Sequence, residues 1–257
     1  MQNSEMPREM EFLQHPVLEV SIGGSVVEKR PSSFKLATQQ GFHSVVSRLL
    51  YPADSDVGNA GDDITVSLVT DDITNLYFTG TIHSANIHGA YRELFLTDSF
   101  KKLCGTDFAA AYRKEKAATI LDDILGAAGI TEKSVTCPAV ELARFSTQTI
   151  PARSCIDLLI DALTAHGARG LHYFFDEKNV FHFGTEADTG KNTGEVFEFE
   201  SGKNIVQKGA GFIEVLPYPI RHTQSVKVDG KEYQTVRTDL IVSRVTSRLT
   251  LYLKGAA

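Results

Sequence analysis

The chain has 257 residues, of which 42% are hydrophobic and 23% are charged, and its formal net charge is −6. No stretch is long and apolar enough to cross a bilayer, so we expect a soluble globular protein that does not bind a membrane by itself. Lysine and arginine do not gather into a dense basic face, which excludes a sequence-wide phosphate-binding surface and leaves DNA only as cargo moving through a channel.

The first residues and the cysteines indicate where the protein is made. Residues 1–16 (MQNSEMPREMEFLQHP) lack the basic flank and the apolar stretch of a secretory signal, which favours assembly inside the cell that makes the protein. Cys104, Cys137 and Cys155 are odd in number and show no CxxC spacing. We therefore expect reduced thiols rather than a disulfide framework or a four-ligand zinc site.

The region from residue 17 to residue 50 has the pattern of short strands. Residues 17–22 (VLEVSI) alternate apolar and polar side chains, and Gly23 and Gly24 form a two-residue turn into residues 25–28, as in a hairpin. Residues 34–37 begin another strand. Residues 41–50 fit both a helical stripe and a strand, and the pair of adjacent valines favours the strand.

More strands follow the polar loop at residues 51–63 (YPADSDVGNAGDD). The next segment, ITVSLV, places alternate apolar side chains on one face. In the following segment, LYFTGTIHSANI, Thr79 and Gly80 interrupt a strand as a bulge or a sharp barrel bend would. A strand at residues 91–97 closes the region, and five or more such strands predict a small barrel or sandwich.

Two amphipathic helices are predicted in the middle of the chain. Residues 117–128 place apolar side chains at helical spacing, and Gly129 supplies the stop. A second helix is expected after Pro151, with Ser154 and Asp157 as an S-x-x-D start. It should end at Gly167. Its predicted apolar stripe consists of Cys155, Leu158, Leu159, Ala162 and Leu163.

A hairpin and a second β-rich region complete the chain. The runs LHYFF (171–175) and VFHF (180–183) flank a four-residue polar loop, which is typical of a β-hairpin. Residues 186–195 are polar and glycine-rich, as at a boundary between units. Strand patterns then return in VFEFE, FIEVLP, SVKVDG, YQTVRT and LIVSRVTSRLTLYL.

The sequence contains no motif for catalysis. The GxSxG, HExxH, Walker-A and GxGxxG patterns are absent, so we expect no catalytic residues and no cofactor. His83 and His88, or the cross-strand candidates His172 and His182, could contribute to a metal site, but the spacing suggests no third ligand. Partly buried, hydrogen-bonded histidines on an aromatic-rich sheet are the preferred explanation, so no metal is predicted.

Three pairs of adjacent aspartates could hold calcium or do acid-base work. They are Asp62 with Asp63, Asp71 with Asp72, and Asp122 with Asp123. The first two pairs lie in polar turns without the alternation and terminal Glu of a calcium loop. The third lies on the polar side of a predicted helix, so solvated carboxylates are expected at all three places.

Two connected blocks carry a resemblance to a known family. Residues 117–130 (AATILDDILGAAGI) and 145–184 (FSTQTIPARSCIDLLIDALTAHGARGLHYFFDEKNVFHFG) resemble the middle of phage baseplate hub proteins, the late-control D family, and the equivalent region of type VI secretion spike proteins. Upstream, GDDITVSLVTDDITNLYFTGTIHSANI resembles the first tube-like barrel of that family. Downstream, LIVSRVTSRLTLYL resembles the closing strand pair of its second barrel.

The resemblance implies an α+β, mainly β fold with two tube-like β-barrel units and an inserted helix-helix-hairpin module. The expected domains are residues 15–105 for the first barrel, 106–190 for the inserted module and 191–257 for the second β unit. It further implies a homotrimer in the tail baseplate of a virion, assembled in the host bacterial cytoplasm, which joins a sixfold tail tube to a threefold spike. Because nothing spike-like follows residues 254–257, a separate central spike protein is expected.

Neighbouring copies of such a subunit are expected to pair strand to strand through residues 61–69 and 240–253. The predicted contact residues are Ile64, Val66, Leu68, Ile241, Val242, Val245, Leu249 and Leu251. Two other classes stay open. A carbohydrate-binding or adhesion module would expose strand aromatics, although the chain has no Trp. A hydrolase would need a deep pocket holding groups with shifted pKa values.

Overall fold

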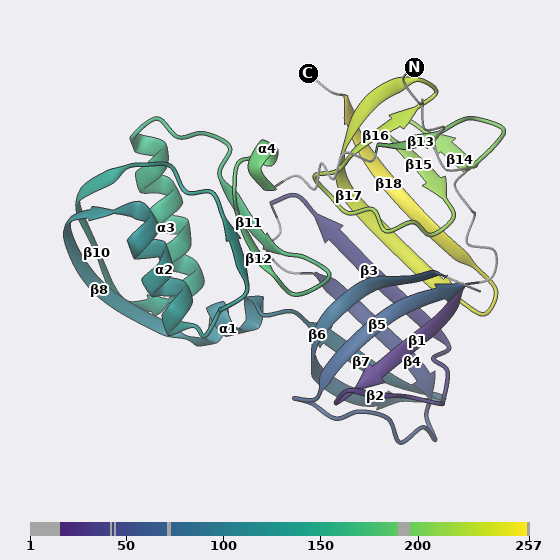
Figure 1. Cartoon of the computed structure of the whole chain (residues 1–257). Coiled ribbons are helices and arrows are strands. Elements are labelled where there is room, and N and C mark those ends of the chain that lie inside the picture. The colour runs from purple at the N-terminus through teal and green to yellow at the C-terminus, as the bar shows by residue number, and fades with distance from the viewer. Residues whose placement is uncertain (1–15, 42, 44, 71–72, 190–195, 256–257) are drawn as a thin grey trace, which may run out of the picture.

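The computed structural model describes residues 16–41, 43, 45–70, 73–189 and 196–255, which form a β lobe and a smaller lobe that contains the helices, called the α lobe (Figure 1). The β lobe contains β1 (Val17–Ile22), β2 (Ser25–Val26), β3 (Ser33–Gln39), β4 (Val46–Pro52), β5 (Asp63–Thr70), β6 (Ile73–His88), β7 (Tyr91–Thr97), β13 (Phe197–Phe199), β14 (Ile205–Gly209), β15 (Phe212–Val215), β16 (Ser225–Val228), β17 (Lys231–Ser243) and β18 (Ser247–Gly255). The α lobe contains α1 (Phe100–Gly105), β8 (Asp107–Lys116), α2 (Ala117–Ala127), β9 (Lys133–Val135), β10 (Glu141–Pro151), α3 (Ala152–Ala165), β11 (His172–Phe175), β12 (Phe181–Gly184) and α4 (Glu186–Thr189).

The β lobe is one continuous sheet. Its 13 strands follow the order β14-β15-β18-β17-β3-β4-β7-β6-β5-β1-β2, with β13 and β16 attached beside β17. The two halves meet where β3 and β17 pair antiparallel, with Leu36 opposite Leu240 and Phe34 opposite Val242. The α+β, mainly β class is therefore confirmed. The described strands nevertheless form an open sheet rather than two closed barrels, because β3 and β17 join the two halves and no pairing connects the end strands β14 and β2.

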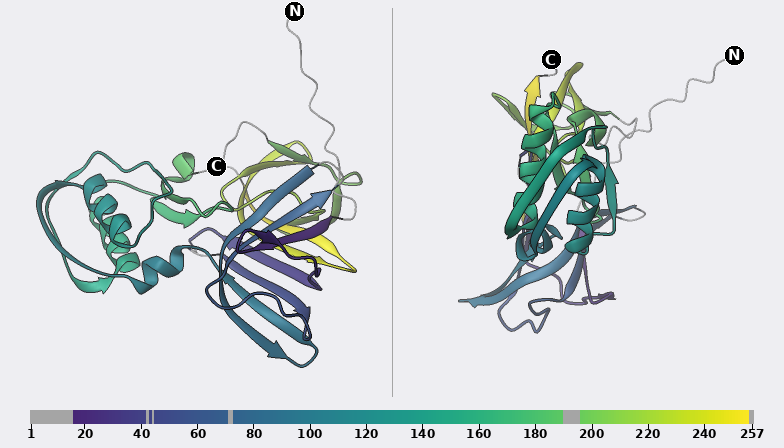
Figure 2. Two further views of the ribbon diagram at one scale, coloured as in Figure 1. Left: turned by 60° about the horizontal axis from the view of Figure 1, so that its bottom comes forward. Right: turned by 90° about the vertical axis from the view of Figure 1, so that its left-hand side faces the viewer.

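Two separate hydrophobic cores correspond to the two lobes. The first combines side chains from both ends of the chain, including Leu49 and Phe78 from the first half and Val226 and Leu251 from the second. The second core lies entirely between residues 103 and 183. The α lobe is thus an insertion between two chain segments whose strands together form the β lobe (Figure 2). Those two segments bury their apolar side chains in one core.

The hairpin and helix predictions for several segments are confirmed. β1 pairs with β2 across the Gly23 and Gly24 turn, and residues 46–52 form a strand, as the adjacent valines favoured. The helix α2 ends before Gly129, whose φ of 65° is a backbone conformation that glycine adopts without strain. The hairpin of β11 and β12 also forms as predicted, with Phe175 opposite Phe181.

Two details of the α3 prediction are wrong. The helix begins at Ala152, directly after Pro151, and no side chain caps it, so Ser154 lies inside the first turn instead of preceding it. Pro151, with its extended backbone, occupies the position before the first helical residue, which the S-x-x-D pattern had assigned to Ser154. Leu158 is exposed and Ile156 is buried in its place, because α3 faces both α2 and the β8–β10 ribbon.

The largest element that the sequence did not predict is the long ribbon of β8 and β10. The two strands pair antiparallel over their whole lengths, with Lys116 opposite Glu141 and Asp107 opposite Pro151. The ribbon curves around α2 and α3 at the end of the molecule farthest from the β lobe (Figure 1). Residues 107–116 (DFAAAYRKEK) are rich in helix formers, and only the tertiary pairing makes them a strand.

The interruption of β6 lies at other residues than predicted. Its ladder shifts register at Tyr77 and at His83, on either side of the expected bulge, while Gly80 stays paired with Ile64. A glycine is needed at position 80 because the backbone of Thr97 and the ring of Phe78 come very close to it. A Cβ atom there would lie 2.3 Å from the carbonyl oxygen of Thr97 and 2.7 Å from the Phe78 ring.

We therefore expect Gly80→Ala to lower the free energy of unfolding by roughly 1–3 kcal/mol, because the methyl group meets backbone rather than a side chain that can move. Gly126→Ala on α2 is the matched control, since a Cβ there meets no atom within 4 Å. That variant should gain up to about 1 kcal/mol from helix propensity. Urea unfolding of both variants measures the difference, and equal stabilities would contradict the prediction.

Candidate functional site

The histidines singled out in the sequence do not form a metal site. His172 and His182 lie on paired strands but not opposite each other, because His172 faces Gly184. The His172 ring contacts the hydroxyl of Thr189 at 2.7 Å, and the His182 ring lies 3.1 Å from the Asp176 carboxylate. Within the described ranges, no three His, Cys, Asp or Glu side chains are grouped so that they could hold a metal ion.

The cysteines have the environment of structural thiols. Cys104, Cys137 and Cys155 are all free. Burial raises the pKa of Cys137 to about 11 and also raises the pKa of Cys155. These thiols are therefore protonated at neutral pH, and a protonated thiol is a poor nucleophile.

The described aspartates of the acidic pairs hold local structure. Asp122 forms an ion pair with Lys133 at 2.7 Å, and Asp123 accepts a hydrogen bond from the Tyr112 hydroxyl. Asp62 accepts the backbone N–H of Asn59 in the loop before β5. The prediction for Asp71 and Asp72 lies outside the described residues.

Six of the eight predicted contact residues belong to the core of the chain itself. Ile64, Val66, Leu68, Val242, Leu249 and Leu251 are each no more than 2% exposed. This corrects the sequence prediction, since such side chains are not available to a neighbouring molecule. The alternating pattern identified an apolar face correctly but could not show that the face is turned inward. Ile241 and Val245 are exposed, and a contact through them stays a prediction.

The strands chosen for pairing with a neighbour have no free edge either. β5 lies between β6 and β1, β17 lies between β3 and β18, and β18 lies between β17 and β15. Open edges occur instead at the two ends of the sheet. One end is β14, which carries the half-exposed Val206. The other is β1, where β2 pairs with Ser21 and Ile22, the Val27 N–H donates to the Val20 carbonyl oxygen, and the start of the strand is uncovered.

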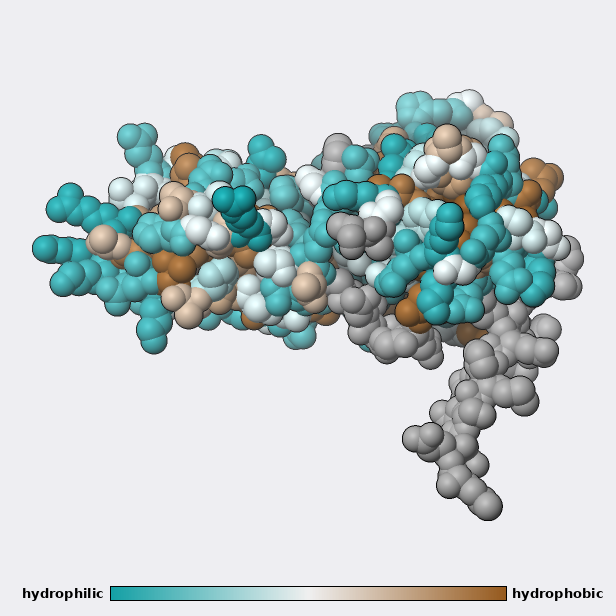
Figure 3. Space-filling model, turned by 90° about the horizontal axis from the view of Figure 1, so that it is seen from above, coloured by the Kyte–Doolittle hydropathy of each residue, from teal (hydrophilic) through white to brown (hydrophobic). Residues whose placement is uncertain are grey.

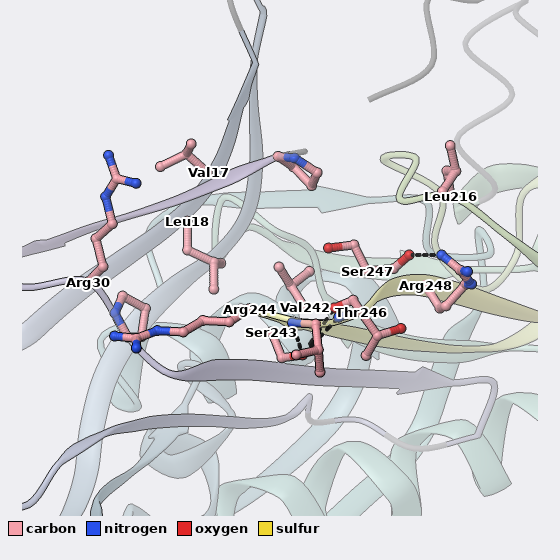
Figure 4. Close-up of a pocket in the computed structure, with 13 residues that line it drawn as sticks. Val17, Leu18, Arg30, Leu216, Val242, Ser243, Arg244, Thr246, Ser247 and Arg248 are labelled. Atoms are coloured by element: carbon pink, nitrogen blue, oxygen red, sulfur yellow. Dashed lines mark hydrogen bonds between the residues drawn. The ribbon is translucent and has the colours of Figure 1, made fainter. Parts of the chain in front are cut away.

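A cavity of about 820 Å³ lies beside β1, between the start of that strand and the turn that joins β17 to β18 (Figure 4). Its apolar lining comes from Val17, Leu18, Leu216 and Val242. Its lining also includes Arg30, Arg244 and Arg248, and none of the described residues that line it is acidic. The cavity thus combines an apolar lining with concentrated positive charge in a chain whose net charge is −6.

The two lobes are joined through a buried arginine. Arg221 approaches the carboxylate of Glu177 at 3.0 Å and donates hydrogen bonds to the carbonyl oxygens of Phe175 and Tyr77. Glu177 and Phe175 belong to the α lobe, whereas Tyr77 lies on β6 of the β lobe. Burial lowers the pKa of Arg221, and the neighbouring carboxylates oppose that effect. One desolvated charge therefore connects both lobes at once.

His222 lies next to this junction and is also buried. Its ring packs edge-on against Phe174 at 4.8 Å between centroids, and neither ring nitrogen has a hydrogen-bond partner among the described residues. Burial, with the positive charge of Arg221 as a second cause, lowers the pKa of His222 to about 3. The imidazole is therefore neutral at physiological pH.

The outer surface offers few other recognition features. On the face shown in Figure 3, hydrophilic side chains dominate and apolar side chains form small separate patches. Of the strand aromatics that an adhesion module would expose, Tyr91 and Phe95 on β7 reach the surface, at 49% and 38% exposure. Among the described residues, no helix has both the length and the apolar character needed to span a membrane.

Several solved structures share this architecture, whereas sequence comparison finds no relative. No protein-family model and no curated protein matches the sequence. Among solved structures, the 43 kDa tail protein of prophage MuSo2 from Shewanella oneidensis superimposes with a TM-score of 0.70 at 10% identity, over 94% of this chain and 98% of that one. The tail protein from Neisseria meningitidis MC58 superimposes with a TM-score of 0.69 at 10% identity, over 94% of this chain and 97% of that one.

A third similar structure comes from a secretion apparatus. The E. coli c3393 protein, described as a type VI secretion component similar to the T4 tail proteins gp27 and gp5, gives a TM-score of 0.67 at 12% identity, over 93% of this chain and 77% of that one. The fold is therefore shared with phage tail and type VI secretion components. The resemblance to baseplate hub proteins seen in the sequence is confirmed by this similarity.

Removing the charge that links the lobes should be strongly destabilising. Arg221→Ala removes the buried cation from the partly buried Glu177 and from the carbonyl oxygens of Phe175 and Tyr77, so the free energy of unfolding should fall by about 3–5 kcal/mol. Arg169→Ala, an exposed arginine of the α lobe, is the control and should change it by less than about 0.5 kcal/mol. Urea unfolding tests this. A loss no larger than that of the control would mean that Arg221 does not hold the lobes together.

The neutral His222 should make stability depend on pH. The pKa of His222 in the folded chain lies below the ordinary value of 6.5. The contribution of the neutral imidazole to the free energy of unfolding is therefore complete above pH 6.5 and is lost as the pH falls toward 3. The slope is about 1.4 kcal/mol per pH unit in that window. His222→Leu should reduce the slope, whereas His166→Leu, at an exposed position, should not. Chemical unfolding from pH 7 to pH 4 measures this, and parallel curves for His222→Leu and the native chain would refute it.

Proposed function

We propose that the chain is a structural baseplate hub subunit of a phage tail or a prophage-derived contractile injection apparatus. In this role three copies form a ring that joins the tail tube to a separate central spike protein. The subunit acts in the tail baseplate of the virion after assembly in the bacterial cytoplasm, and DNA passes the ring only as cargo. The proposal needs no catalytic residue and no cofactor.

The observation that carries the proposal is the extent of the structural likeness. Two prophage or bacterial tail proteins match this chain over nearly the whole length of both partners, so the likeness is not confined to one common module. The similar type VI secretion component extends beyond this chain, since 77% of it is covered.

The open sheet provides a physical means of assembly. An unpaired strand edge presents free N–H and C=O groups that pair readily with a strand of another molecule. In this chain β14 ends the sheet at one side, and its exposed Val206 lies at a register shift opposite β15. A contact between two different surfaces of neighbouring copies closes into a ring when its rotation fits the symmetry.

A solution mass measurement tests the ring. Light scattering during size-exclusion chromatography should give the mass of three chains of 28.2 kDa each at high protein concentration. Val206→Lys should reduce the trimer fraction, because a lysine on an edge strand opposes strand addition. Val46→Lys is the control, since Val46 is exposed on β4, a strand paired on both sides.

The outcomes separate the parts of the proposal. A native chain that stays monomeric at high concentration would overturn the ring. Trimers of unchanged abundance with Val206→Lys would exclude the β14 edge while leaving the ring in place. Proline at Ile64 or Val242, within the segments first expected to carry the contact, would instead disrupt the core and is not a test of assembly.

A further inference from the structure

We propose that the cavity beside β1 binds an extended acidic segment of another protein chain. The site combines three features that such a segment requires: arginines without acidic partners, an apolar lining and a free strand edge. The inference goes beyond the hub proposal and does not depend on it, because a single copy of the chain contains the whole cavity.

The arginines of the cavity are available to a ligand. Neither Arg30 nor Arg244 forms an ion pair or a side-chain hydrogen bond with any part of the chain that the structure describes, and both are exposed. Arg248 uses one N–H for the carbonyl oxygen of Ser247. Other arginines of the β lobe do form ion pairs, as Arg48 does with Glu93 and Arg237 with Asp239. Carboxylates of a second chain are the groups that a planar guanidinium binds best in a protein partner.

The turn between β17 and β18 holds Arg244 at the rim of the cavity. The Ser243 hydroxyl accepts hydrogen bonds from the backbone N–H groups of Val245 and Thr246. The Ser243 N–H in turn donates a hydrogen bond to the Thr246 carbonyl oxygen. This local bonding fixes the turn before any ligand arrives, which lowers the entropy lost on binding. Val245 at the tip of the turn is 94% exposed, so the rim also presents an apolar side chain.

The strand edge of β1 explains why the ligand should be extended. The carbonyl oxygen of Val20 accepts the N–H of Val27, so the backbone groups of Val20 point away from β5. Residues two apart on a strand point to the same side, and the groups of Leu18 therefore share this direction. No strand in the described chain pairs with Leu18 on that side. An incoming strand can hydrogen-bond there while its acidic side chains reach Arg30 and Arg244.

The alternative of a nucleic acid is less consistent with the site. A run of phosphates is held by a row of cations along an extended groove, whereas these arginines surround a concave, largely apolar space (Figure 4).

The test measures binding of three fluorescent probes to the full chain by anisotropy. The probes are a short peptide that alternates Glu and Val, its counterpart with Lys in place of Glu, and a single-stranded DNA oligonucleotide of similar length. The acidic peptide should bind best, and added salt should weaken it. The double variant Arg30→Gln with Arg244→Gln should lower its affinity at least about tenfold, because each lost charge-assisted hydrogen bond is worth about that factor.

Two further variants make the result specific. Arg169→Gln, on the α lobe and away from the cavity, should bind like the native chain. Leu18→Pro removes an N–H that faces away from β5, so the sheet should remain intact while the acidic peptide binds more weakly. Equal binding of the acidic and basic peptides, tighter binding of the DNA, or unchanged affinity in the double arginine variant would each overturn the proposal.

Discussion

The attachment of the two lobes depends on the desolvated guanidinium of Arg221. Removing a charge from water is costly, and the structure compensates with one carboxylate and two carbonyl oxygens that come from different lobes. The arrangement works only when the Glu177 loop and β6 are both in place. Arg221 therefore sets the relative position of the lobes more stringently than apolar contacts alone, which are not directional.

The course of the chain explains why such a link is needed. The chain leaves the β lobe after β7, builds a lobe with its own core, and returns to complete the first sheet through β17 and β18. The pairing of β3 with β17 joins residues about 200 positions apart, as the hydrogen bond between the buried Thr38 and Thr238 hydroxyls illustrates. Arg221 links the insertion to the β lobe, because it contacts the loop between β11 and β12 on one side and β6 on the other.

The distribution of chemistry agrees with a structural role. The buried ionisable groups are used in packing and in joining the lobes, and the thiols are kept protonated by burial. What remains accessible is suited to recognition: an open edge at β14, and an arginine-bearing cavity at the other end of the sheet. Both features present unsatisfied backbone or charged groups, which favour partners over substrates.

The sequence by itself determined the local elements. The helix at residues 117–127, the hairpin between β11 and β12 and the turn at Gly23 and Gly24 follow from side-chain periodicity and turn chemistry, which are properties of neighbouring residues. The resemblance to hub proteins rests on the order of these same elements. It could be recognised because that order survives when identity falls to about 10%.

Only the tertiary structure decided which faces and edges are free. Ile64 and Val242 show the alternation of a contact strand, yet both lie in the core, because alternation specifies an apolar face and not what covers it. The ribbon strand at residues 107–116 was missed because its pairing with residues 141–151 outweighs its helix-forming composition. Arg30, Arg244 and Leu18 are distant in sequence, and no local pattern relates them. Their cavity exists because non-local strand pairing leaves the sheet open beside β1.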